Sequence, residues 1–469
     1  MAAAPARASR LDGIRFAALV VLPNLVQGLF RRRRWAVRLA TDVDVDGRAI
    51  AFLNALRRRS GAGPIWIEMP GNAALFVQDS ADIRRVLGSS PEPFASDPPT
   101  KRRGMVHFQP DALTISRGAR WRERRRVTAA VLDTSAPIHR FAGRFSNVVV
   151  EEVAALLEET ARARRGELGW AAFHDCFGRI ARRVIFGDAA RNDLEMSRLL
   201  ARLMAEANSL PKSDSPDLEQ LLQRIRHYID RAEGGSLVSL FADAEPEPDT
   251  VVEGQVPHWM FASHDTLAAN VYRALALIVS HPAPQGKVRE ELAAHGSHRG
   301  MQAAAAAGSL SYTGACLQDA MRLYPTTTTL SREAVTDVAW DGANVPVGSV
   351  LLISNTFNHR DRERHEFADR FTPEHWLDPA AVDDWSFNQF SHGPQACPGA
   401  GLAMLLGTTA LGALLIDHEI RLLWPKVDPQ RPLPYMLDIF RVRFAVDSVL
   451  PRTRAGPRPH EARTLYVER

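Results

Sequence analysis

One long apolar segment, residues 256–280 (VPHWMFASHDTLAANVYRALALIVS), constrains the fold more than any other part of the chain. It holds few charged residues, and a helix of that length would carry apolar side chains on most of its faces. Such a helix has to be buried on most sides, so we expect it at the centre of a larger helical body. His281 and Pro282 follow and end it, because the residue before a proline disfavours helical geometry.

The rest of the chain predicts a mainly α-helical protein with small β-sheets. Strand-like pieces occupy 65–77, and alternating stretches such as 339–352 predict β-hairpins. The 469 residues are 45% hydrophobic, enough for a large core, and neither a repeat nor a clear linker divides them. We expect one domain over 36–469, preceded by an N-terminal segment, 1–35. Apolar residues recur at helical spacing over 51–59, 80–87, 120–165 and 401–416.

The N-terminal segment contains an uncharged run, Phe16–Phe30, followed by four arginines. A helix that crosses a membrane needs about 20 apolar residues, whereas this run is shorter and contains Pro23, Asn24 and Gln27. A cleaved signal peptide also fits poorly, because an arginine block follows the run in place of a small-residue cleavage site. We predict a buried or surface helix of the fold, and the alternative is a peripheral contact with a membrane.

Charge and cysteine content exclude several classes of protein. The net charge of +4 is carried almost entirely by arginine, and the arginines are spread among acidic residues along helical stretches. A nucleic-acid-binding protein would instead concentrate them beside stacking aromatic residues, so we expect no nucleic-acid partner. Cys176, Cys316 and Cys397 include no close pair. Neither a disulfide framework nor a zinc site is predicted, and a cytoplasmic location fits best.

Cys397 has the most distinctive surroundings of the three cysteines. It lies in the run FSHGPQACPGAGLA, which begins at Phe390 and leads into an apolar helix. Backbone N–H groups and a helix N-terminus lower the pKa of a cysteine and favour the thiolate that binds iron. Glycines let the backbone approach a flat macrocycle closely. An isolated cysteine is more often a buried structural residue, but this run suits a metal-bound thiolate.

The same run resembles the haem-binding loop of the cytochrome P-450 family, which implies that Cys397 is the iron ligand. Where the family usually has an Arg or His that contacts a haem propionate, this chain has Gln395, which can donate a hydrogen bond without a charge. The aromatic residue, the glycines, the ligand and the Leu-Ala pair of the family's loop are here Phe390, Gly393, Cys397, Gly399, Leu402 and Ala403.

Two elements upstream resemble the family as well. Asp319 and Arg322 in QDAMRLYP resemble its buried Glu-x-x-Arg pair, and the resemblance makes His375 in TPEHW their third partner. Within the long apolar segment, ASHDT resembles the oxygen-binding segment with its acid–alcohol pair, here Asp265 and Thr266. Cleaving dioxygen requires two protons, which a hydroxyl backed by a carboxylate can relay through water, so we predict that these two residues are catalytic.

Further basic residues are candidates for the haem site. Trp121 and Arg125 lie four residues apart on one helical face and resemble the family's Trp-x-x-x-Arg element, which contacts a haem propionate. Arg332 in TLSREA is placed similarly for the other propionate. From charge alone, the neighbouring arginines are candidates for a basic surface that meets an acidic electron donor, namely Arg122, Arg124 and Arg126.

Together these elements imply the triangular, helix-rich haem domain of the cytochrome P-450 fold. The implied function is a haem b monooxygenase that inserts one atom of dioxygen into a small apolar substrate. No flavin or iron–sulfur motif is visible, so electrons would come from a ferredoxin with its reductase or from a flavoprotein reductase. The candidates to line the substrate pocket are Phe108, Leu113, Ile115, Met260, Phe261, Thr328–Leu330 and Tyr435–Leu437.

Other haem proteins stay open as alternatives. A peroxide-driven hydroxylase would not need the acid–alcohol pair, so Asp265 and Thr266 count against it. A haem carrier or sensor without turnover, or an enzyme that rearranges its substrate, is compatible with the departures from the family's pattern. The location that we expect is cytoplasmic, with peripheral membrane contact as the alternative.

Overall fold

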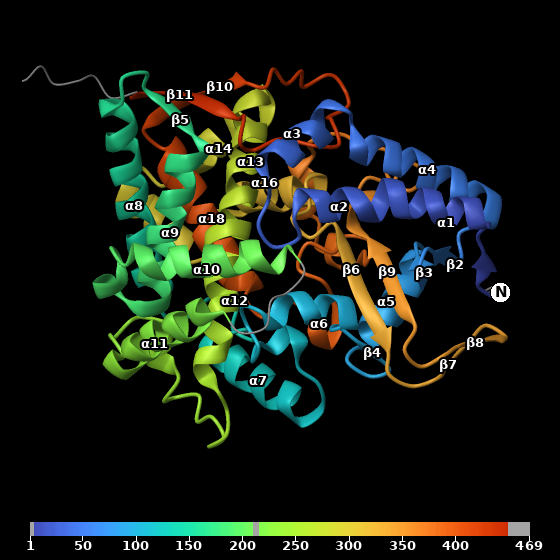
Figure 1. The fold of residues 1–469 in the computed structure, drawn as a ribbon. Coiled ribbons are helices and arrows are strands. Elements are labelled where there is room, and N and C mark those ends of the chain that lie inside the picture. Colours follow the sequence, from blue (N-terminus) through green and yellow to red (C-terminus); the bar gives the residue numbers. More distant parts are fainter. Residues whose placement is uncertain (1–3, 210–214, 449–469) are drawn as a thin grey trace, which may run out of the picture.

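The computed structural model describes residues 4–209 and 215–448 and confirms a mainly helical protein with small sheets (Figure 1). Its α-helices are α1 (Arg10–Phe16), α2 (Leu22–Gln27), α3 (Arg34–Asp42), α4 (Val45–Ser60), α5 (Ser80–Gly88), α6 (Pro99–Val106), α7 (Gly118–Val131), α8 (Ala142–Arg162), α9 (Trp170–Phe186), α10 (Leu194–Ala207), α11 (Pro216–Arg231), α12 (Val256–Phe261), α13 (Leu267–Ser280), α14 (Pro282–Ala294), α15 (His298–Ala306), α16 (Ser311–Leu323), α17 (Asn355–Asn358) and α18 (Ala400–Leu415).

The long apolar segment forms one helical stretch from α12 to α13, as predicted, and α13 packs against α9, α16 and α18. Between α12 and α13 lies a π-helical turn, Ala262–Thr266. Such wide turns are often found at functional sites. The candidate acid–alcohol pair therefore lies where the central helix is locally widened.

Strands form three small sheets. The largest has the order β1-β2-β3-β9-β6-β4, and Figure 1 shows it on one side of the molecule, with most of the helices on the other. A second sheet has the order β10-β11-β5, and β7 pairs with β8 in a hairpin. The strands are β1 (Ala6–Arg7), β2 (Ile65–Met69), β3 (Asn72–Val77), β4 (Phe94–Ala95), β5 (Glu167–Gly169), β6 (Thr329–Ala334), β7 (Val338–Trp340), β8 (Ala343–Val345), β9 (Val350–Ser354), β10 (His418–Trp424) and β11 (Arg443–Ser448).

The region 120–165 is not one long helix but two, α7 and α8, joined by a turn. Asp133 adopts a left-handed backbone conformation (φ 47°) in that turn and pairs with Arg140. The apolar spacing continues across the break, because both helices contribute to the same core. Spacing alone could therefore not reveal the turn.

The N-terminal helices α1 and α2 lie beside the large sheet, where Phe16 is buried against Phe76 with ring centroids 5.6 Å apart. Within the described residues, no helix is both long and apolar enough to cross a membrane. Several large apolar side chains of α1–α3 and the loop before α3 are nevertheless exposed, namely Leu11, Ile14, Leu22, Leu25, Val26, Leu29, Trp35 and Leu39. The division at residue 35 stays a prediction.

Candidate active site

The Cys397 loop lies between a short 3-10 turn, Gly393–Gln395, and the start of α18. The Cys397 N–H donates to the Phe390 carbonyl at 2.8 Å, which closes the loop. Gly393 has φ 72°, and a Cβ atom there would lie 2.2 Å from the Leu87 carbonyl oxygen. Only glycine fits this position without a shift of the backbone.

The Cys397 side chain is exposed, although protein groups surround it. Burial raises the pKa of the Cys397 thiol, while a hydrogen bond from the Gly399 N–H and the nearby Arg125 guanidinium lower it. Arg125 itself donates to the Ala396 carbonyl at 2.6 Å. Both neighbours would stabilise an anionic sulfur at this position, as a thiolate ligand requires.

Two further cations lie close to the loop. Arg332 on β6 is 3% exposed and donates to the Ser90 hydroxyl at 3.1 Å and the Ser391 hydroxyl at 3.4 Å. Burial lowers the pKa of Arg332 to about 10. Lys101 on α6 donates to the Ser96 carbonyl at 2.8 Å, and burial together with Arg332 lowers the pKa of Lys101 to about 7.

These cations fit an anionic cofactor. Within residues 4–209 and 215–448, neither Arg125, Lys101 nor Arg332 forms an ion pair. Burying a charge without a counter-ion is costly, and the carboxylates of a haem would supply that counter-ion here. Gln395 Oε1 is buried without a protein partner in the described chain, but an amide oxygen accepts hydrogen bonds, so only the Gln395 NH2 group could donate to a carboxylate.

The Asp319–Arg322 pair is wholly buried and fully bonded. Asp319 Oδ1 accepts from Arg322 Nε at 2.5 Å, and Asp319 Oδ2 accepts from the Thr372 N–H at 2.6 Å. The remaining N–H groups of Arg322 donate to the carbonyls of His359, Ala368 and Arg370.

The prediction that His375 is the third partner of this pair is wrong. The indole N–H of Trp376 donates to Asp319 at 3.0 Å in its place. The His375 ring instead lies beside Phe367, with ring centroids 4.6 Å apart. The short turn Pro373–Leu377 places the Trp376 side chain against the Asp319 carboxylate.

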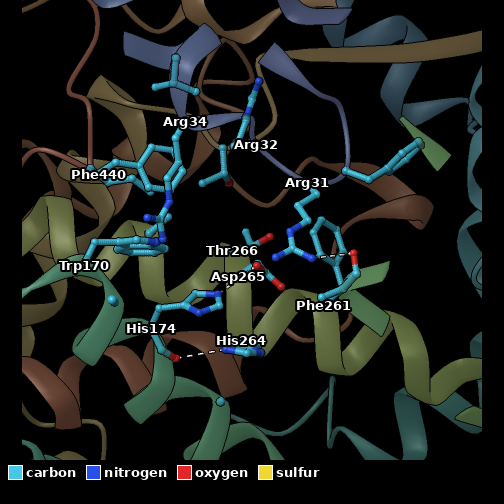
Figure 2. A pocket seen from close by; sticks show the side chains of 18 of the residues that line it. Arg31, Arg32, Arg34, Trp170, His174, Phe261, His264, Asp265, Thr266 and Phe440 are labelled. Atoms are coloured by element: carbon cyan, nitrogen blue, oxygen red, sulfur yellow. Dashed lines mark hydrogen bonds and ion pairs between the residues drawn. The ribbon is translucent and has the colours of Figure 1, made fainter. Parts of the chain in front are cut away.

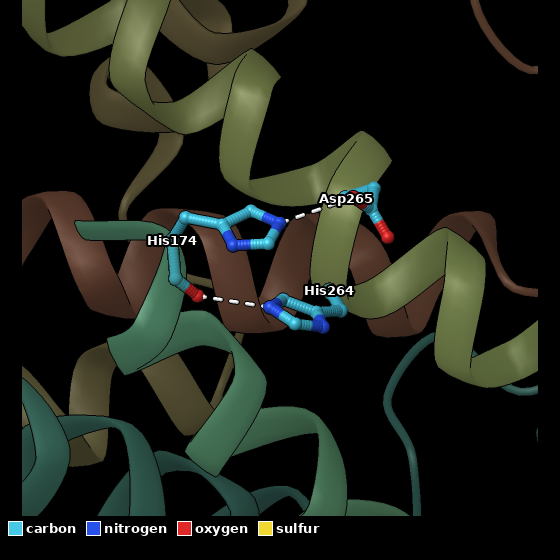
Figure 3. Close-up of side chains that lie close together, drawn as sticks. All are labelled: His174, His264 and Asp265. Carbon is cyan, nitrogen blue, oxygen red and sulfur yellow. Dashed lines mark hydrogen bonds and ion pairs between the residues drawn. The ribbon is translucent and has the colours of Figure 1, made fainter. Parts of the chain in front are cut away.

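Asp265 in the π-turn bonds to a histidine from another helix (Figure 3). His174 Nε2 on α9 lies 3.0 Å from Asp265 Oδ1, and His264 Nε2 lies 3.1 Å from the His174 carbonyl. Burial alone would raise the pKa of Asp265, but the hydrogen bond with His174 and nearby positive charge, including that of Arg31, lower it. Burial lowers the pKa of His264 to about 3, which leaves that ring neutral.

A cavity of about 840 Å³ opens beside this group (Figure 2). Asp265 and Thr266 line it together with residues of α9, α13, the loop before α3 and the segment 435–440. Of the predicted pocket residues, the lining includes Phe261, Thr328, Tyr435, Met436 and Leu437. The others are not among its lining residues, and four of them are buried in the core, namely Phe108, Leu113, Ile115 and Met260.

The order of these elements along the chain is matched by known proteins. A family model described as cytochrome P-450 matches residues 218–437, a range that includes Asp265, Asp319 and Cys397. The chain belongs to the cytochrome P-450 family. The structure of this P-450 also has the mainly helical architecture and small sheets that the resemblance implies, and membership implies a haem iron cofactor.

Curated relatives support the same family. The cytochrome P-450 monooxygenase sphH of Aspergillus fumigatus is 30% identical over 177 residues, which cover 34% of this chain and 32% of that protein. Cytochrome P-450 81F4 of Arabidopsis thaliana is 25% identical over 411 residues, covering 78% and 80%. The (+)-piperitol/(+)-sesamin synthase of Sesamum radiatum is 30% identical over 192 residues, covering 40% and 37%. The match spans about a third of the length of the first relatives.

The structure of this P-450 contains site residues that the sequence did not reveal. Lys101 and His174 lie far from the recognised motifs, and only the rarity of lysine in the chain marks the first of them.

Trp121 lies part-buried on α7, one turn before Arg125. The proposed basic surface is reduced, because Arg124 pairs with Asp111 and Arg126 pairs with Glu123.

Proposed function

We propose that this protein is a haem-thiolate monooxygenase that binds haem b through Cys397 and inserts one atom of dioxygen into an organic substrate. The observation that carries the proposal is the accessible Cys397 thiol, with the Gly399 N–H on its sulfur and Arg125 beside it. When bound, the haem would supply the electron transfer and oxygen activation. Residues that would hold its carboxylates are Trp121, Arg125, Arg332, Gln395 and Lys101.

In this proposal the chain's own residues manage protons above the haem. Asp265 is held as an anion by His174, whose side chain is 25% exposed and can exchange protons with water. A proton can thus pass from water to His174, then to Asp265 Oδ1, and then through water to the Thr266 hydroxyl. Thr266 lies at the end of the widened turn and lines the cavity, where that hydroxyl can meet a bound molecule.

Electrons would come from a separate ferredoxin with its reductase or from a flavoprotein reductase. Arg122 supports such a contact, since it is exposed and makes no ion pair in the described part of the chain.

We place the enzyme in the cytoplasm, in peripheral contact with a membrane through the exposed apolar residues of α1–α3 and the arginines beside them. Sedimentation with anionic vesicles would support that contact, and a protein that stays in the supernatant would contradict it.

The test uses the haem-loaded enzyme, a donor system and labelled dioxygen. We expect substrate-dependent oxygen consumption and a product that contains one labelled oxygen atom. Thr266→Ala should keep the donor's electron flow but lower the yield of product, whereas Thr266→Ser should retain most of the coupling. No oxygen consumption with any competent donor would favour a carrier or sensor, and labelled product from peroxide alone would favour a peroxide-driven enzyme.

A further inference from the structure

Eight arginines line the cavity, and we call four of them the arginine cluster: Arg31, Arg32, Arg34 and Arg273. Arg31 and Arg32 precede α3 and Arg34 is its first residue, and Figure 2 shows the three on the side of the pocket that faces Asp265 and Thr266. Within residues 4–209 and 215–448, none of the four forms an ion pair. Arg31 and Arg34 are exposed, whereas Arg32 and Arg273 are partly buried. Partly buried arginines without a carboxylate partner are unusual unless they meet another anion.

Arg273 is the best placed of the four to bind a ligand. One of its N–H groups donates to the Tyr324 carbonyl at 3.1 Å, while its Nε atom is buried without a protein partner in the described chain. Burial and the neighbouring Arg32 lower the pKa of Arg273 to about 10. The Arg273 guanidinium is therefore still charged at neutral pH and has N–H donors without a protein partner.

The acidic groups around the cluster do not balance its charge. Asp46 is the cavity carboxylate that acts on both Arg32 and Arg273, and burial raises the pKa of Asp46 to about 6. Asp438 acts on Arg273 from outside the cavity wall. Asp265 is already bonded to His174. This part of the cavity thus keeps a surplus of positive charge.

The position of Arg273 also fixes the distance between the cationic end of the cavity and Thr266. It follows Thr266 by seven residues on the regular helix α13, which places both on the same face, roughly 10 Å apart along the axis. Aromatic and aliphatic groups line the same cavity, including Trp170, Phe261, Leu437, Ile439 and Phe440. The lining thus combines a cationic end with apolar walls.

We propose that the substrate of this enzyme is a mainly apolar molecule that carries a carboxylate, which Arg32 and Arg273 hold, with the site of oxidation roughly 10 Å away near Thr266. This inference rests on the proposed monooxygenase function. It narrows the apolar substrate that the sequence predicts to an amphipathic acid.

The test compares the binding of dodecanoate with that of its uncharged methyl ester. The haem-loaded protein is titrated with each probe in a calorimeter. Charge-assisted hydrogen bonds contribute about 1.5–3 kcal/mol, so we expect dodecanoate to bind roughly ten-fold or more tightly than the ester. Arg273→Met and Arg32→Met should each remove most of that preference and leave the binding of the ester unchanged.

Arg38→Met is the matched control, because Arg38 is exposed on α3 outside the cavity lining and should leave the preference intact. Equal binding of acid and ester by the wild-type protein would overturn the inference, as would a preference that survives both cavity substitutions. If Arg273→Met does not fold, Arg32→Met decides. Binding requires no turnover, so an arginine-dependent preference without oxygenated product would contradict the proposed function and leave the carboxylate site standing.

Discussion

Arg322 and Arg332 are both buried arginines, but they are satisfied in different ways. Arg322 has a carboxylate, Asp319, and three backbone carbonyls as partners. Arg332 has two serine hydroxyls and its neighbour's carbonyl, and Lys101 nearby adds a second positive charge. A buried charge that the protein neutralises itself contributes to the fold, whereas a buried charge without a counter-ion in the protein indicates where an external anion binds.

The largest effect on stability should follow from removing the carboxylate that neutralises Arg322. Asp319→Ala leaves Arg322 buried without a counter-ion, which typically costs about 3–5 kcal/mol in the free energy of unfolding. Denaturant unfolding of the haem-free protein measures it. Glu290→Ala, at an exposed position on α14, is the control and should change stability by less than about 0.5 kcal/mol. An equally mild effect of Asp319→Ala would remove the contrast between the two arginines.

The opposite behaviour is expected at the unsatisfied site. Arg332→Met removes a buried, unpaired cation, so the stability of the haem-free protein should stay the same or increase. The affinity for haem should fall roughly 10–100-fold, because a charge-assisted hydrogen bond worth about 1.5–3 kcal/mol is lost. Haem transfer to a scavenging apoglobin measures the affinity. A loss of haem-free stability as large as that of Asp319→Ala would show that Arg332 is structural.

A smaller effect distinguishes the two candidates for the third partner of Asp319. Trp376→Phe removes the indole donor and should lower stability by about 1.5 kcal/mol, since the carboxylate keeps its other partners. His375→Phe retains a ring against Phe367 and should change stability by less than about 0.5 kcal/mol. Thermal unfolding of both variants gives the comparison, and the reverse order would restore His375 as the partner.

Over one pH unit, the smallest effect is a pH dependence that belongs to Lys101. Its pKa is about 7 in the folded, haem-free protein and 10.5 for an unperturbed lysine. Between these values the unfolded chain binds a proton that the folded protein has released, so stability should rise with pH, by at most roughly 1.4 kcal/mol per pH unit. Lys101→Met should lack this component. A wild-type protein whose stability shows no such excess slope would contradict the low pKa.

The sequence could predict the parts of the site that are local along the chain. The Cys397 loop, the 256–280 helix and the Asp319–Arg322 spacing each lie within one segment, so residue types and spacing indicate them. Lys101, His174 and Trp376 reach their partners only through the packing of separate elements, and no local pattern marks them. The arginine block before α3 was visible, but its approach to the cavity depends on how the N-terminal helices lie beside the sheet.

The absorption spectrum of the purified, dithionite-reduced protein with carbon monoxide tests the central claim most directly, with Cys397→Ala measured beside it. A strongly red-shifted Soret band in the wild type, absent from the variant, is the predicted result. A band at the unshifted position in both proteins, or no haem at all, would contradict the assignment of Cys397 as the iron ligand.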